Sequence, residues 1–295
     1  MTFESWTVAA AIEAELIQFE ASTGANIPTA RRPLTDREIA AGTQFGDLDA
    51  IVTTNTAEGV PLIDELYASA EAAILAEIYR TQDGAWEDTA EVAVVVGLLM
   101  LLMSERPTLY LESIQRTQPE LHRLLSQSYD GGVLTVVDEA RRQGQDTSTW
   151  NRPGVSPIPG VLAASIAGHP LTRTIERLIK ELQSTRRAVA GTISRTDMAT
   201  VLAGTTRKGS IDLLKQGNQA AMAQGRIDTV ERLGITPALV VASEILDDNT
   251  CVPCKTVDGQ EYPSLEAAAM DYPSGYAGCS GGARCRGVLV FLWAL

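Results

Sequence analysis

All four cysteines of the 295-residue chain lie in one stretch near its C-terminal end, as two close pairs. Cys251 and Cys254 form a C-x2-C pair, and Cys279 and Cys285 form a C-x5-C pair after a loop. Two short pairs separated by a loop are typical of one tetrahedral Zn²⁺ ion, because each turn supplies two thiolates. The spacing predicts a structural zinc site, since four Cys ligands leave no position for a catalytic water.

Three other states of these cysteines compete with zinc: two disulfides, a redox-active pair at Cys251 and Cys254, and free thiols. A redox pair of this kind needs a strand before the motif and a helix that begins at its first Cys. Residues 255–259, Lys-Thr-Val-Asp-Gly, indicate a turn instead. Residues 1–23 are acidic and helical in pattern, so we expect no signal peptide. Disulfides are then less favoured, because no oxidising compartment is indicated.

A wider motif surrounds the cysteines. It consists of Asp-x-Thr-Cys-x-x-Cys at 248–254, Asp-Gly at 258–259, a loop that contains proline, and Cys-Arg at 285–286 before an apolar segment. With these residues the chain resembles the C-terminal domain of the bacteriophage Mu F-type minor head proteins, also called the phage head morphogenesis family. The resemblance covers about residues 190–292 and is sharp only over 244–287.

Many members of that family close with His-Pro-x-Cys-Arg-Cys. Here Cys279 takes the place of the histidine and Gly287 that of the final cysteine, which keeps four ligands. The resemblance implies a minor capsid (head) protein of a tailed bacteriophage that is associated with the portal and acts in head assembly and in DNA packaging or ejection. It implies the portal or the major capsid protein as partners. The expected location is the virion, after synthesis in the cytoplasm of the bacterial host.

Candidates for catalysis are few. His122 and His169 are not near a motif serine or cysteine, and we expect them to be exposed or capping residues. Asp247 and Asp248 could bind a metal ion or act as acid and base, although capping of a turn is the commoner use. We therefore expect no catalytic residues and no enzymatic activity. The alternative is a capsid maturation protease or a transient head-assembly factor, because proteins with this domain are sometimes given the protease label in phages of actinobacterial hosts. A toxin-delivery module is a weaker alternative.

The composition favours helices. The chain is 45% hydrophobic but only 5% aromatic, and it is rich in Ala, Leu, Glu and Arg. Its longest apolar run, Val92–Met103, is shorter than the roughly 18 residues of a membrane span, so we expect no membrane segment. We expect this run to form a helix buried on all sides, either in a core or between copies of a homo-oligomer.

The net charge of −13 is unevenly distributed. Residues 1–170 carry a net charge of −14 and residues 227–295 one of −5, whereas residues 171–226 have ten basic and four acidic side chains. The basic segment could face packaged DNA or an acidic protein surface. The alternative is a solvated helix face that acids of the same chain neutralise. No aromatic residue is interleaved with the bases, which disfavours stacking on single strands.

The elements that must position the cysteines follow from periodicity and breakers. Strands are expected at 238–246 and 288–293, paired with each other across the metal site. Helices are expected over 1–23, over a short stretch that starts at a Thr35/Glu38 capping box, and over 61–80, 90–104, 107–126 with a break at Pro119, 133–142 and 171–225. Loops are expected over 24–33 and 42–59, a turn at Asp130-Gly131-Gly132, and a linker over 143–160.

These elements predict a mainly α protein with a helical N-terminal region and a small α+β C-terminal module that carries the four-Cys zinc site. The predicted division is a helical N-terminal domain over 1–150, a basic helical connecting segment over 151–226, and the Cys-rich module over 227–295.

Overall fold

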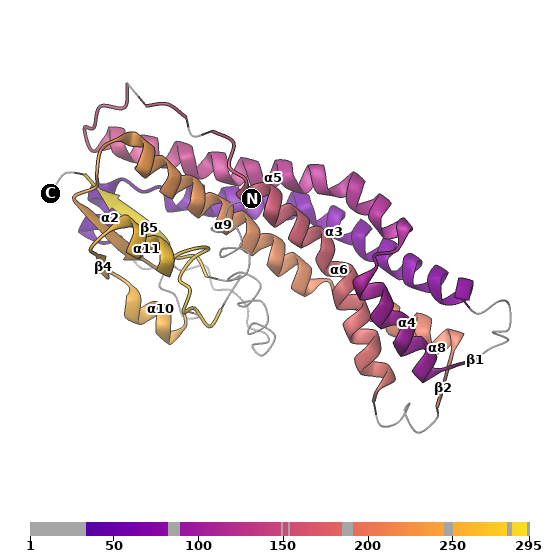
Figure 1. The fold of residues 1–295 in the computed structure, drawn as a ribbon. Helices are drawn as coiled ribbons and strands as arrows, with labels where there is room; N and C mark the ends of the chain where they lie inside the picture. Colours follow the sequence, from indigo (N-terminus) through magenta and orange to yellow (C-terminus); the bar gives the residue numbers. More distant parts are fainter. Residues whose placement is uncertain are drawn as a thin grey trace. The chain divides into compact units, whose positions relative to one another are not determined.

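A computed structural model describes residues 34–81, 89–148, 150–152, 154–184, 191–244, 250–281 and 285–293. The chain is mainly helical, with a small sheet near its C-terminal end, as the sequence predicts (Figure 1). The elements are α2 (Asp36–Ala41), α3 (Phe45–Thr81), β1 (Thr89–Glu91), α4 (Val92–Ser104), α5 (Thr108–Arg142), α6 (Ile158–Leu182), β2 (Thr192–Ser194), α8 (Arg195–Ala203), α9 (Lys208–Leu233), β3 (Leu239–Ser243), α10 (Val252–Val257), β4 (Glu261–Tyr262), α11 (Leu265–Asp271) and β5 (Val288–Leu292). The helix expected over 1–23, the loop over 24–33 and the pair Asp247–Asp248 lie outside the described residues.

The described residues divide into two compact units that are built from interleaved segments. The first unit contains the described residues up to Glu58, His122–Leu162, and those from Asp212 onward; the second contains Gly59–Leu121 and Ala163–Ile211. Helices α3, α5, α6 and α9 each contribute to both units. The sequential division into 1–150, 151–226 and 227–295 stays a prediction.

Helix α3 replaces the loop predicted over 42–59, so that prediction is wrong. The loop was expected from the Thr, Asp and Gly content of this segment. However, Phe45, Leu48 and Val52 already follow helical spacing, and all three are buried. Burial of one continuous apolar face therefore outweighs the local preference for a loop.

Three helices continue through a proline. Pro61, predicted to open a helix, lies inside α3, and Pro119, predicted to break one, lies inside α5. Pro170 lies inside α6. A proline removes one helical hydrogen bond and costs roughly 3 kcal/mol in an isolated helix. These helices have 25 to 37 residues, so that packing of the flanking turns can offset this cost.

The Asp-Gly-Gly turn predicted at 130–132 is also helical, because its second glycine serves close packing. A Cβ atom at Gly132 in α5 would lie 2.1 Å from the backbone oxygen of Met222 in α9. Reciprocally, a Cβ atom at Gly225 in α9 would lie 2.1 Å from the backbone oxygen of Tyr129 in α5. The two helices of the first unit therefore cross backbone to backbone at a pair of glycines.

A three-stranded antiparallel sheet of order β4-β3-β5 ends the first unit. The predicted pairing of the last two long strands is confirmed, with Val241 opposite Val290. One face of the sheet, which includes Phe291, packs on residues of α5, α9 and α11. The other face, which includes Val241 and Val290, packs on Ala41 and Phe45 from α2 and α3. The sheet thus lies between two helical layers, within the first unit (Figure 1).

The predicted capping box at the start of α2 is confirmed. The Thr35 hydroxyl accepts from the Glu38 backbone N–H at 3.3 Å, and the Glu38 carboxylate accepts from the Thr35 backbone N–H at 2.6 Å. Glu38 is 3% exposed and also accepts a hydrogen bond from the Ser243 hydroxyl. The cap therefore joins α2 to the end of β3, next to the segment that leads to the cysteines.

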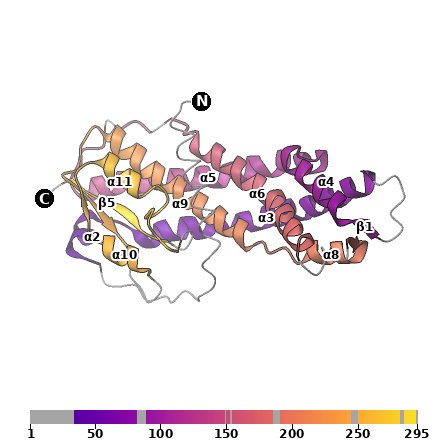
Figure 2. The same ribbon diagram turned by 60° about the horizontal axis from the view of Figure 1, so that its bottom comes forward.

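A short ribbon organises the second unit. β1 and β2 pair antiparallel, with Ala90 opposite Ile193, and α4 and α8 follow directly after the two strands. The ribbon fixes where both helices begin (Figure 2). Periodicity did not predict it, because three residues are too few to show strand alternation.

The sequence predicted that α4 is buried on all sides, and this prediction is wrong. Only Val95, Leu99 and Leu102 of α4 are buried among its described residues. Among the described residues, the helical stretch Val92–Arg142, which contains α4 and α5, is long and apolar enough to cross a membrane by length and composition. The most apolar 18-residue segment of this stretch has a mean hydropathy of 1.7, and 17% of that segment is buried.

Candidate metal centre

Each cysteine occupies the edge of a local element in the first unit. Cys251 is the N-cap of α10, and Cys254 lies in the first turn of that helix. Cys279 lies in a turn after α11, where its N–H donates to the Tyr276 backbone oxygen at 2.9 Å. Cys285 lies three positions before β5, the last strand of the sheet. The turn predicted at 255–259 is corrected: residues 255–257 belong to α10, and the chain turns only after Val257.

The fold brings the four predicted cysteines together. Cys251 and Cys279 have Sγ atoms 3.8 Å apart. The Sγ atoms of Cys251, Cys254 and Cys279 all lie within 4.8 Å of one another, and so do the donor atoms of Cys254, Cys285 and Glu244. Cys254 and Cys285 are buried, at 3% and 6% exposure, while the other two are half-buried.

This arrangement fits a tetrahedral metal ion. A Zn–S bond of about 2.3 Å implies an S···S distance of about 3.8 Å along each edge of a tetrahedron. The distance between Cys251 and Cys279 has this value. Four thiolates are also the donor set of structural zinc and of iron–sulfur sites. The cluster is therefore compatible with a metal site.

Glu244 is a fifth donor that the sequence analysis did not identify. It follows β3, is 2% exposed, and has its Oε2 atom 3.9 Å from Cys285 Sγ. The Tyr272 hydroxyl donates to Glu244 Oε1 at 2.8 Å. Burial raises the pKa of Glu244 to about 7, although hydrogen bonds from Tyr272 and Cys254 act in the opposite direction. A buried carboxyl after a strand could not be foreseen, since nothing in its sequence context distinguishes it from an exposed acid.

Two glycines leave room for these groups. Gly275 has φ +106°, and a Cβ atom there would lie 2.9 Å from Cys285 Sγ. At Gly287 a Cβ atom would lie 2.2 Å from Glu244 Oε1. Gly287 therefore leaves room for the Glu244 carboxylate, which a side chain at this position would displace.

The thiols also affect one another. Hydrogen bonding with the neighbouring thiols of Cys254 and Cys285 lowers the pKa of Cys279. The same contact raises the pKa of Cys254, because its proton is shared with a neighbouring thiol. A metal cation that displaces these protons would be coordinated by the thiolates together, and the thiols would no longer compete for protons.

The structure bears on the disulfide and redox alternatives. All four cysteines are described, and all are free thiols. A sulfur–sulfur distance of 3.8 Å is far from the roughly 2.05 Å of a disulfide. A redox pair was disfavoured because a turn, not a helix, was predicted after Cys251. A helix does begin directly after Cys251, so this reason is wrong. Two further thiols beside the pair now disfavour a redox pair, because a dithiol couple needs only two.

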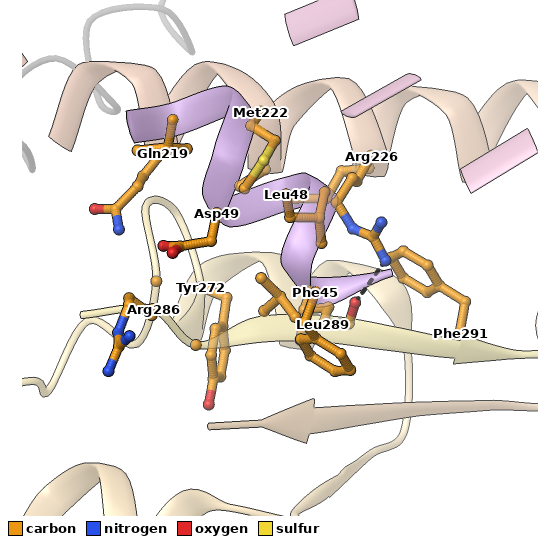
Figure 3. A pocket seen from close by; sticks show the side chains of 16 residues that line it. Phe45, Leu48, Asp49, Gln219, Met222, Arg226, Tyr272, Arg286, Leu289 and Phe291 are labelled. Carbon is orange, nitrogen blue, oxygen red and sulfur yellow. Dashed lines mark hydrogen bonds between the residues drawn. The ribbon is translucent and has the colours of Figure 1, made fainter. Parts of the chain in front are cut away.

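A pocket lies beside the cysteine cluster in the first unit. Figure 3 shows the side chains that line it. It shares Tyr272, Gly275 and Gly287 with the surroundings of the thiols. Gln219 also lines it: its Nε2 atom donates to the Cys285 backbone oxygen, and its buried Oε1 finds no hydrogen-bond partner among the described residues. The other lining residues are Phe45, Leu48, Asp49, Val52, Met222, Ala223, Arg226, Ile227, Arg286, Val288, Leu289 and Phe291.

A buried ion pair supports the wall of this pocket. The Arg226 guanidinium donates to both oxygens of Glu139 at 2.9 Å, and the two side chains are 3% and 1% exposed. It also donates to the Leu289 backbone oxygen at 3.0 Å, as the dashed line in Figure 3 marks. This arginine therefore joins α5 and α9 to β5, the strand that follows the last cysteine.

His169 has a serine neighbour in the second unit that lies 41 positions further along the chain. Its Nδ1 atom lies 2.7 Å from the Ser210 hydroxyl oxygen, which is also 3.0 Å from the Tyr67 hydroxyl. Ser210 is 0% exposed, so that no substrate reaches it. Burial lowers the pKa of His169 to about 4, which makes it a poor base at neutral pH. His122, the other histidine, is half-buried on α5.

Several bases of the segment 171–226 are paired with acids of the same chain. Arg207 lies 2.9 Å from Asp64 in the second unit, and Arg226 is bound by Glu139 in the first. Both acids belong to the acidic first half of the sequence. These pairs favour the neutralised helix face for part of the segment, while contact with DNA stays a prediction.

Comparison of this chain with protein-family models, with characterised proteins and with solved structures finds no match.

Proposed function

We propose that the chain is a non-enzymatic structural protein whose C-terminal module is held together by one Zn²⁺ at Cys251, Cys254, Cys279 and Cys285. The observation that carries the proposal is the convergence of four thiols from two turns that are far apart in sequence. When bound, the ion would supply charge neutralisation and a cross-link, since four thiolates leave no open coordination position.

Stabilisation is the role that suits such an ion in this module. Among the described residues from Glu244 to Cys285, the structure has two short helices and a two-residue strand. A segment of this size has little core of its own, and a metal ion commonly supplies the missing stability. Glu244 and Tyr272 would orient the buried thiolates by hydrogen bonding rather than react with a substrate.

For the biological role, we propose a minor capsid (head) protein of a tailed bacteriophage, associated with the portal and acting in head assembly and DNA packaging or ejection. The resemblance of residues 244–287 to the Mu F-type minor head proteins supports this role. The same residues form the thiol cluster, so that one module would account for both the motif and the fold. Portal or major capsid protein would be the partner, and the virion the location.

The alternative, a capsid maturation protease, rests on weaker observations. A serine protease needs an accessible hydroxyl beside a base that can accept its proton. Ser210 and His169 are in contact, but Ser210 is fully buried and the pKa of His169 is low. A transient assembly factor would need no such site and differs from the first proposal only in leaving the particle.

Quantitative mass spectrometry of purified virions from the encoding phage tests the proposed role. The full-length chain at a few to a few tens of copies per particle is the expected result. The termini of the coat protein are read in the same run. Absence of the chain from particles whose coat protein is cleaved would contradict the structural role and favour the protease or assembly-factor alternative.

A further inference from the structure

The four thiols of the cluster differ in their access to solvent. Cys254 and Cys285 are buried, whereas Cys251 and Cys279 are half-buried. The two half-buried cysteines are also close to each other, with Sγ atoms 3.8 Å apart. We call Cys251 and Cys279 the accessible pair. A dissolved oxidant reaches the accessible pair before it reaches the two buried thiols.

The surroundings of the accessible pair suit a reaction in which one sulfur attacks and the other follows. The Gly281 backbone N–H donates to Cys279 Sγ at 3.2 Å. Such a hydrogen bond stabilises a thiolate, the form of cysteine that attacks an oxidant. Cys251 is the N-cap of α10, but its side chain makes no capping hydrogen bond. Its sulfur can therefore change partner without the loss of a helix cap.

We propose that the accessible pair is an oxidation site, at which a peroxide joins Cys251 and Cys279 in a disulfide and thereby releases the metal ion. The inference rests on the proposed zinc site and adds a means of regulating it. The oxidant is a peroxide because this class of molecule is small, uncharged and able to accept two electrons from sulfur.

The reaction has two steps. In the first, Cys279 Sγ attacks one oxygen of the peroxide: an S–O bond forms, the O–O bond breaks, and with hydrogen peroxide the departing hydroxide takes a proton and becomes water. In the second, Cys251 Sγ attacks the sulfur of Cys279: the S–S bond forms, the S–O bond breaks, and a second hydroxide leaves as water. The two sulfurs are oxidised, the peroxide is reduced, and zinc keeps its charge.

Release of the ion follows from the donors that remain. Cys254, Cys285 and Glu244 keep their donor atoms within 4.8 Å of one another, and all three residues are buried. Two thiolates and one carboxylate bind zinc more weakly than four thiolates do. The new disulfide would join α10 to the turn after α11 in place of the ion, so that the two local elements stay connected.

The C-x2-C pair, Cys251 and Cys254, is the competing disulfide. Cys254 is 3% exposed in the first turn of α10, so that an oxidant in solution has little access to it. The accessible pair instead offers two half-buried sulfurs 3.8 Å apart. Mapping of the disulfide distinguishes the two pairings.

The test is treatment of the full-length, zinc-loaded chain with hydrogen peroxide at a small molar excess. Zinc content is measured before oxidation, and a coloured chelator follows the ion that is released. The remaining thiols are then alkylated in denaturant, and the peptides are identified by mass spectrometry. The expected result is a disulfide between Cys251 and Cys279, alkylated Cys254 and Cys285, and one zinc ion released for each disulfide formed. A reductant with added zinc should restore the loaded chain.

Two variants that each lack one ligand form a matched pair. Cys285→Ser retains the accessible pair and is expected to form the same disulfide. Cys279→Ser lacks the attacking sulfur, so its thiols should be lost to peroxide at least about tenfold more slowly than those of Cys285→Ser. Equal rates in the two variants would show that Cys279 is not the attacking residue and would overturn the reaction order.

Three results with the wild type would overturn the proposal: a disulfide between any other two cysteines, oxidation of Cys279 to a sulfinic acid without a disulfide, or zinc that stays bound after the disulfide has formed. A chain that contains no zinc before oxidation would contradict the zinc site instead. The disulfide map of that chain would still test the pairing, so the two failures can be told apart.

Discussion

Cys251 Sγ lies 3.8 Å from Cys279 Sγ, although the two residues are 28 positions apart in the sequence. The first begins α10, and the second lies in the turn after α11. Their proximity means that a single ion would join the two local elements that follow β3. The buried Glu244 carboxylate lies beside the cluster, with its Oε2 atom 3.9 Å from Cys285 Sγ.

Replacement of Cys251 by serine is expected to release the metal and to lower the unfolding temperature markedly. A serine hydroxyl is a poor zinc ligand, and the three remaining thiolates bind the ion more weakly. A chelator should lower the unfolding temperature of the wild type in the same direction. His122→Ala is the control, because this half-buried histidine on α5 is remote from the thiols in sequence; it should leave metal content and stability unchanged. A Cys251→Ser protein that retains both would contradict this expectation.

Gly132→Ala is expected to destabilise the protein by about 1–3 kcal/mol or more, because the new methyl group would collide with the backbone of α9. Gly46→Ala, near the start of α3, is the matched control: a Cβ atom there meets nothing within 4 Å. That control should be neutral or stabilise by up to about 1 kcal/mol. Urea unfolding of both variants measures the difference. Equal stability of the two would show that the helices can separate at no cost.

Arg226→Met is expected to cost about 3–5 kcal/mol of unfolding free energy, because it leaves the buried Glu139 carboxylate without its partner. The double variant Arg226→Met, Glu139→Leu should recover much of the loss, since an apolar pair of similar volume needs no compensation. A double-mutant cycle measures the coupling. If the single and double variants lose the same free energy, the ion pair is not the reason for the burial.

The stability of the wild type relative to a His169→Asn variant should depend on pH. Burial lowers the pKa of His169 to about 4, from an ordinary value of 6.5. Below pH 6.5 the unfolded chain binds a proton that the folded chain does not, so acidification favours unfolding until about pH 4. The contribution is up to roughly 3 kcal/mol across this window. Asparagine can still hydrogen-bond Ser210 but does not titrate.

Unfolding free energies of both proteins, measured at several pH values between 7 and 4, test this expectation. The difference between them should shrink or change sign as the pH falls. Burial raises the pKa of Glu244, which makes its own contribution opposite in sign, but this group is common to both proteins and cancels. Parallel pH profiles would mean that His169 is protonated as easily in the folded chain as in the unfolded one.

Features set by local chemistry could be predicted from the sequence. The Thr35–Glu38 capping box depends on residues three apart, and it is confirmed. The two strands that pair as β3 and β5 showed their apolar character locally, and the cysteine spacing predicted that the four thiols meet. Each of these depends on short stretches whose meaning changes little with tertiary context.

Features that depend on tertiary contacts could not be predicted from the sequence. Gly131-Gly132 has the composition of a turn, but only the approach of α9 explains why glycine is needed inside a helix. Val92–Met103 is apolar on every side, and composition alone does not tell which side faces the chain's own core. The contacts of Glu244 and of His169 join residues more than 25 positions apart, and no local pattern marks them.

The most direct test of the metal centre is native mass spectrometry of the purified full-length chain, with elemental analysis of the same sample. One Zn²⁺ per chain and four cysteines that resist alkylation until a chelator is added are the predicted results. A stable chain that contains no metal, with four thiols that react at once or with two disulfides, would contradict the zinc site.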